Sequence, residues 1–141
     1  MGLFDMFGGP KHPVLDPGTP AAAALEANAS LLGELADQVG GGFEVVPAED
    51  GAMYVFIGSP PKAFGVAWLS EGEQHNLKKL AERLGLGFNS VADLTERLGA
   101  AYSAHKDEPR FSATVGKHRF TVTQSEALGR EVAAIIASVE P

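Results

Sequence analysis

Histidine is the residue type in this sequence best suited to metal binding or proton transfer, and the chain contains 4 of them. Most lie far apart along the chain, whereas zinc motifs place two ligands within a few residues of one another. One cluster is still conceivable, because Asp107 and Glu108 follow His105 and a predicted hairpin begins its second strand at His118. His105 and His118 are therefore the candidate metal ligands, and sensing of a metal or small ligand is one alternative function.

Other catalytic signatures are missing from the sequence. The chain has no Cys, which excludes disulfides, thiolate nucleophiles, and zinc–thiolate or iron–sulfur sites. No serine lies in a Gly-x-Ser-x-Gly elbow, and no pair of carboxylates shares a predicted face. The glycines at 40–42 precede a strand and not a helix, so they lack the context of a phosphate-binding loop. We expect no enzymatic activity and no cofactor.

Residues 77–98 hold the sharpest local pattern. Ala81, Gly85, Val91 and Leu94 have the spacing of the helix-turn-helix motif of bacterial regulators, which this segment resembles. The side chains that would contact nucleic acid there are Lys78, Lys79, Arg83, Asn89, Ser90 and Arg97. Acidic residues on the second helix oppose phosphate binding. Nucleic-acid binding is therefore an alternative and not the leading hypothesis.

Large apolar side chains near loops are the candidates for protein binding. They are Leu3, Phe4, Met6 and Phe7 in an apolar N-terminal heptapeptide, and Tyr54, Phe64, Trp68, Pro60 and Pro61 in a predicted strand region. Each group also has a simpler interpretation, because a terminus can fold back on its own domain and aromatic residues in strands usually fill a core. A Pro- and Gly-rich stretch over 8–20 predicts an extended tether behind the heptapeptide.

The hydrophobic pattern predicts the elements that position these residues. Thr19 and Pro20 form a helix start, and the periodicity indicates a helix over 20–39. Three strands are predicted at 43–46, 52–57 and 64–69. The second strand is apolar without alternation, which indicates a central strand covered on both faces.

The rest of the chain is predicted to form two helices, two strands and a last helix. Residues 74–106 have helical periodicity that is interrupted at 85–87, with Ser90 expected to start the second helix. Strands at 111–115 and 118–123 flank a two-residue Gly-Lys loop, which sets Val115 opposite His118. A last helix follows, and a capping box over 123–126 is expected to start it.

The assembled order, α-βββ-αα-ββ-α, predicts an α+β fold with an antiparallel sheet of about five strands and helices packed on it. We expect a single domain over 20–141, preceded by a flexible tip and tether over 1–19. The order resembles that of the type III secretion chaperones, small acidic dimers that hold a partner segment in extended form. The resemblance is one of topology and implies a homodimer that binds another protein.

Charge is unevenly distributed along the chain, whose formal net charge is -7. Residues 1–73 contain ten of the 18 acidic residues and two of the 11 Lys and Arg residues, so the later half is nearly neutral. No apolar run is long enough for a membrane span, and no secretion signal is recognisable. We expect a cytoplasmic, non-enzymatic protein-binding domain of the chaperone or adaptor kind, with a protein partner and a homodimeric state.

Overall fold

The computed structural model describes residues 12–39, 43–48, 51–59 and 63–140, and it confirms an α+β fold. In chain order the described elements are α2 (Pro20–Ala27), α3 (Ala29–Val39), β1 (Phe43–Pro47), β2 (Met53–Ser59), β3 (Ala63–Ser70), β4 (Glu73–Asn76), α4 (Leu77–Leu84), α5 (Phe88–Ala104), β5 (Arg110–Val115), β6 (His118–Thr123) and α6 (Glu126–Ala137). Among the described residues, no helix is both long and apolar enough to cross a membrane.

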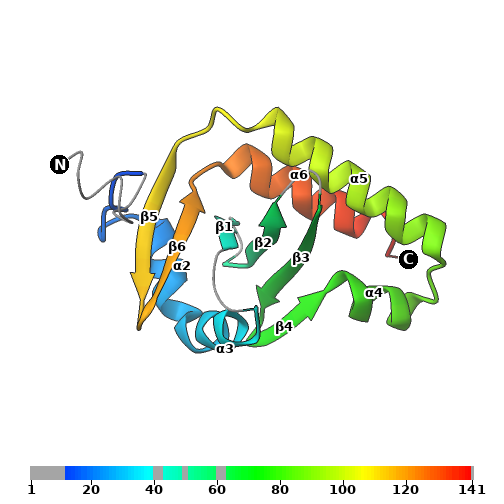
Figure 1. The fold of residues 1–141 in the computed structure, drawn as a ribbon, viewed down its shortest axis with the longest axis horizontal. Coiled ribbons are helices and arrows are strands. Elements are labelled where there is room, and N and C mark those ends of the chain that lie inside the picture. The colour runs from blue at the N-terminus through cyan, green and yellow to red at the C-terminus, as the bar shows by residue number, and fades with distance from the viewer. Residues whose placement is uncertain (1–11, 40–42, 49–50, 60–62, 141) are drawn as a thin grey trace.

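The sheet has 6 strands in the order β4-β3-β2-β1-β6-β5 and is mixed (Figure 1). The prediction of a purely antiparallel sheet of about five strands was therefore wrong in two respects. Strand β6 pairs with β1 in parallel, with Glu44 opposite Thr121, and the segment that contains α4, α5 and β5 provides the long connection that parallel pairing needs. Strand β4 is an additional short strand at the far edge of the sheet.

Strand β4 escaped prediction because its residues are polar and were assigned to a helix. A tight turn produces it: Ser70 pairs with Glu73, and the two residues between them have positive φ angles of 52° at Glu71 and 76° at Gly72. Two consecutive left-handed residues form the turn type whose twist matches that of a hairpin. Backbone geometry, and not hydrophobic alternation, thus extends β3 into β4.

Helices cover both faces of the sheet, as the apolar central strand predicted. On one face, α2 and α3 bury Leu25, Leu32 and Leu35 against β1, β2 and β6. On the other face, α4, α5 and α6 form a second core against β1, β2 and β3. Strand β2 therefore contributes Val55 to one core and Phe56 to the other.

Helix boundaries follow local hydrogen bonding. Thr19 caps α2 as predicted, since its hydroxyl accepts from the Ala22 N–H at 3.2 Å. The predicted helix over 20–39 is interrupted at Asn28, whose side-chain amide donates to the Ala24 carbonyl at 2.9 Å and competes with the helical pattern. The predicted start at Ser90 was wrong, because α5 begins at Phe88. The capping box predicted over 123–126 was also wrong, because Thr123 ends β6 and Ser125 caps α6, its hydroxyl accepting from the Leu128 N–H.

The hairpin of β5 and β6 has the predicted register, in which Phe111, Ala113 and Val115 face Val122, Phe120 and His118. Phe120 and Val122 are buried under α2 and α3, while the neighbouring Thr114 and Arg119 are exposed. Strand β5 lies at the edge of the sheet, which is the left edge in Figure 1.

Candidate functional site

The structure places the aromatic protein-binding candidates of the meander in or beside the second core. Tyr54 is buried, Phe64 is half-buried against Phe56 with ring centroids 5.9 Å apart, and Trp68 is half-buried against His75 at 5.8 Å. Core packing accounts for these contacts. The remaining candidates of this kind, Leu3, Phe4, Met6, Phe7, Pro60 and Pro61, lie outside the described residues.

The two candidate metal ligands are not brought together. His118 lies at the hairpin turn, where its Nε2 is 3.2 Å from Asp37 Oδ1 on α3. His105 lies beyond the open end of the same hairpin, at the end of α5 (Figure 1). Within the described part of the chain, no three metal-binding side chains form a group that could hold an ion.

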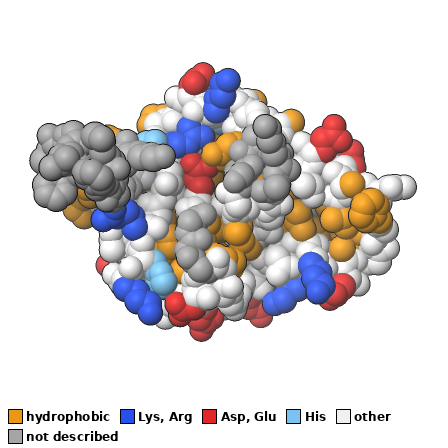
Figure 2. Space-filling model, in the orientation of Figure 1, with side chains coloured by type: hydrophobic (Ala, Val, Ile, Leu, Met, Phe, Trp, Pro, Cys, Tyr) orange, Lys and Arg blue, Asp and Glu red, His pale blue; other side chains and the backbone are white. Residues whose placement is uncertain are grey.

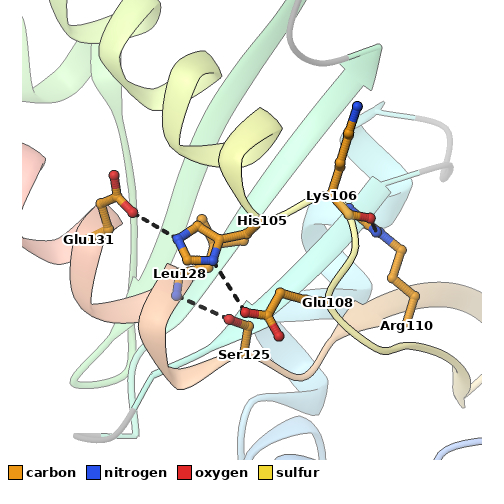
Figure 3. A network of polar contacts seen from close by, with 7 residues as sticks. All are labelled: His105, Lys106, Glu108, Arg110, Ser125, Leu128 and Glu131. Atoms are coloured by element: carbon orange, nitrogen blue, oxygen red, sulfur yellow. Dashed lines mark hydrogen bonds and ion pairs between the residues drawn. The ribbon is translucent and has the colours of Figure 1, made fainter.

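His105 instead belongs to a polar network that joins α5 to α6 (Figure 3). Its Nε2 is 2.8 Å from Glu131 Oε2, and its Nδ1 is 3.3 Å from Glu108 Oε1. The hydrogen bond to Glu131 raises the pKa of His105, and Glu108 adds to the rise, while partial burial opposes it. The imidazole thus lies between a carboxylate of α6 and one that follows α5, and it links the end of α5 to α6.

A second polar group links β1 to β5 across β6. Arg110 Nε donates to Glu44 Oε1 at 2.7 Å, and its guanidinium lies 5.5 Å from the ring centroid of Tyr102. Burial raises the pKa of Tyr102, and the nearby Glu44 carboxylate raises it further. Glu44 Oε2 and the buried Thr123 Oγ1 make no hydrogen bond to any described residue. Because this ion pair is largely buried, loss of either partner would leave the other charge uncompensated and destabilise the fold.

The nucleic-acid candidates lie on a helical hairpin formed by α4 and α5, as the helix-turn-helix spacing predicted. Gly85 ends α4 in the left-handed region, with a φ of 66°. Two of the cations are bound within the chain, since Arg83 pairs with Glu140 and Arg97 donates to Ser138 Oγ at 3.0 Å. Lys78, Lys79, Asn89 and Ser90 are exposed, as are the acidic residues Asp93 and Glu96 on α5.

Sequence reasoning missed the outer edge of β5. The chain before α2 already uses this edge: the Ser112 N–H donates to the Pro13 carbonyl, and the Leu15 N–H donates to the Ser112 carbonyl, both at 2.8 Å. Val14 thereby forms a parallel bridge with Ser112. Leu15 is buried in the first core, whereas Val14 is 74% exposed. The described part of the predicted tether is thus anchored on β5 between residues 13 and 15.

Pairing on this edge stops before the strand does. In an antiparallel pair, every second residue points its N–H and C=O away from its neighbour strand. Ser112 is such a residue in β5, so Thr114, two positions further, also directs both backbone groups outward. The chain turns away after Leu15, because the Asp16 carbonyl accepts from the Thr19 N–H in a turn that leads into α2. No described residue bonds to the outward backbone groups of Thr114.

A groove of about 790 Å³ lies beside these backbone groups. We name it the strand-edge groove; its apolar lining includes Leu15, Ala22, Leu25, Ala113 and Val115, and Thr114 lies at its rim. Alternation along β5 turns Ala113 and Val115 toward the face covered by α2. The site therefore combines an outward donor and acceptor with an apolar floor, the arrangement that binds added strands.

Comparison with known proteins gives no further guide to the site. No family model matches the sequence, and no curated protein or solved structure shows significant similarity to the chain.

Proposed function

We propose that this protein binds an extended segment of a partner protein, which adds as a strand to the outer edge of β5 beside Thr114. The observation that carries the proposal is the outward N–H and C=O of Thr114, next to a position where the edge already binds an extended segment. An added strand would continue the backbone hydrogen bonding that residues 13–15 begin. Main-chain bonds of this kind provide affinity, and pockets for alternate side chains provide specificity.

The groove indicates the chemistry of the partner segment. A strand beside Thr114 would direct every second side chain toward Ala22 and Leu25 of α2. Alanine side chains leave a shallow floor, so we expect small or β-branched apolar residues at these positions of the partner. The intervening side chains would face solvent and are free to be polar. The binding surface thus differs from the aromatic cluster that the sequence suggested.

The test uses peptides selected from a displayed library of random sequences on the full chain. Selected peptides are then measured against the wild type and two variants, Thr114→Pro and Thr114→Ala. Proline removes the outward N–H, and because that N–H is not part of the β5–β6 ladder, an edge position tolerates it. We expect Thr114→Pro to weaken binding about tenfold or more, which corresponds to about 1.4 kcal/mol. Thr114→Ala keeps the N–H and should bind like the wild type.

A second measurement leaves the protein unchanged. The selected peptide is methylated at one backbone nitrogen at a time, which removes one donor from the peptide. If the peptide adds as a strand, methylation should weaken binding at the one peptide residue whose N–H faces the Thr114 carbonyl and be tolerated at its two neighbours, because only alternate N–H groups face β5 and Ser112 is already bonded to residues 13–15. Equal binding to Thr114→Pro, uniform tolerance of methylation, or a selection that yields no binding peptide would contradict the proposal.

A further inference from the structure

Phe88 is the most exposed large apolar side chain among the described residues, at 87%. It is the first residue of α5, and it follows Gly87, which provides no side-chain cap. Most large aromatic side chains are buried at least in part, so a protruding one commonly marks an interaction site. The exposure is not a consequence of a loose terminus, because Phe88 belongs to the regular hydrogen-bonded helix.

A hollow of about 580 Å³ lies directly beside Phe88. Its lining includes the apolar residues Ala81, Leu86 and Val91, the charged residues Lys78 and Glu82, and the glycines at 85 and 87. Figure 2 shows a hydrophobic patch at the right of the molecule, where α4 meets α5. We name Ala81, Leu86, Phe88 and Val91 the α4–α5 corner. A protruding side chain and a hollow that can receive one are thus neighbours on a single face.

The two helices at the α4–α5 corner carry net charges of opposite sign, since Glu82 on α4 and Arg97 on α5 are each outnumbered by side chains of the other sign. Lys78 and Lys79 are exposed on α4, and Asp93 and Glu96 are exposed on α5. None of these four side chains forms an ion pair within the described part of the chain. Figure 2 shows acidic side chains above the hydrophobic patch, and basic side chains with an acidic one beside them below it.

We infer that two copies of this chain associate through the α4–α5 corner, with Phe88 of each copy inserted into the hollow of the other. A two-fold interface requires a surface that is complementary to itself, and an adjacent side chain and hollow satisfy that condition. The same two-fold rotation places α4 of one copy against α5 of the other. Lysines on one helix then face carboxylates on the other, which favours a second copy over a partner of uniform charge.

The inference is independent of the strand-edge groove. Helix α4 contacts β3 and β4, whereas β5 forms the opposite edge of the sheet. Association through the α4–α5 corner would leave both strand-edge grooves of a dimer accessible. A dimer would then present two binding sites for extended segments, at its two ends.

The test is sedimentation velocity of the full chain at concentrations from about 1 µM to about 1 mM. We expect the dissociation constant of an interface of modest size to fall within this range. The wild type should pass from monomer to dimer within this range. Phe88→Ser should raise the dissociation constant about tenfold or more, because loss of a central aromatic anchor commonly has this effect. Val39→Ser is the matched control, since Val39 is also an exposed apolar residue, at the end of α3, and should leave the dissociation constant unchanged.

Charge exchange tests the pairing of α4 with α5. Lys78→Glu with Lys79→Glu should weaken the dimer, as should Asp93→Lys with Glu96→Lys, whereas the four substitutions together should restore it. A wild type that stays monomeric throughout the range would overturn the inference. A dimer that Phe88→Ser leaves unchanged, or a fourfold variant no tighter than the double variants, would do the same. Thermal unfolding of each variant verifies that the exposed substitutions leave the fold intact.

Discussion

Leu15→Ala tests whether the segment before α2 is part of the folded domain, which the strand-edge groove requires. Leu15 is 6% exposed and packs in the core formed by α2, α3 and the sheet. Truncation of a buried leucine to alanine destabilises a protein by about 2–5 kcal/mol. Leu15 lines the open strand-edge groove, so its site lies near the surface and we expect about 2 kcal/mol, at the low end of that range.

The measurement is urea unfolding of the full chain, followed by thermal unfolding. For a domain of this size, a loss of about 2 kcal/mol lowers Tm by about 5–8 °C. Val14→Ala is the neighbouring control, because Val14 is 74% exposed. Its substitution should change the free energy of unfolding by less than about 0.5 kcal/mol. If Leu15→Ala has as small an effect as the control, residues 13–15 do not pack on β5 in solution, and the groove lacks one of its walls.

Three further predictions concern the rest of the fold. Glu44→Gln should destabilise the protein by about 2 kcal/mol or more in urea unfolding, because it leaves Arg110 without its ion pair. Replacing both Glu44 and Arg110 by Met should restore part of the lost stability, and equal stability of the single and double variants would contradict this. Glu71→Asn should stabilise by about 0.5–1 kcal/mol, since Asn tolerates the φ of 52° better than Glu, and a lower Tm would show that the turn differs. The raised pKa of His105 means that its stabilising effect is complete below its unfolded-state pKa of about 6.5 and is lost as pH rises through its folded-state value, so the stability of the wild type relative to His105→Ala should fall as pH rises above about 6.5; a constant difference between the two proteins would refute the role of Glu131.

Local signals in the sequence were sufficient for much of the fold. The two-residue loop at Gly116 and Lys117 fixed the register of β5 and β6, and the continuous apolar run in β2 indicated cover on both faces. The spacing around Gly85 gave the helical hairpin. These features depend on a few neighbouring residues, and the structure confirms them.

Features that depend on distant contacts or on backbone geometry were missed. The parallel pairing of β1 with β6 brings together residues 44 and 121, and no local pattern encodes it. Strand β4 is polar and exists because a turn at Glu71 and Gly72 returns the chain beside β3. At Asn28 the side chain competes for a helical carbonyl, which periodicity alone does not reveal.

The candidate site was hidden for a related reason. The outward N–H and C=O of Thr114 are backbone groups, so no residue type marks them in the sequence. The apolar pair Val14 and Leu15 within the predicted tether was nevertheless a signal that this segment packs on the domain. Phe88 was placed in a turn before a helix start at Ser90, and its exposure depends on how α4 and α5 pack. The predicted metal pair is not brought together because His118 lies at the turn of the β5–β6 hairpin, whereas His105 ends α5 beyond the open end of that hairpin.

Amide hydrogen exchange at Thr114 tests the central claim most directly. The full chain is measured by NMR with and without a peptide selected on it. If the peptide adds as a strand to β5, the Thr114 N–H gains an acceptor and its exchange should slow about tenfold or more, while the exposed amide of Lys117 in the hairpin loop stays unchanged. A peptide that binds at saturation and leaves the exchange rate of Thr114 unaltered would contradict the account.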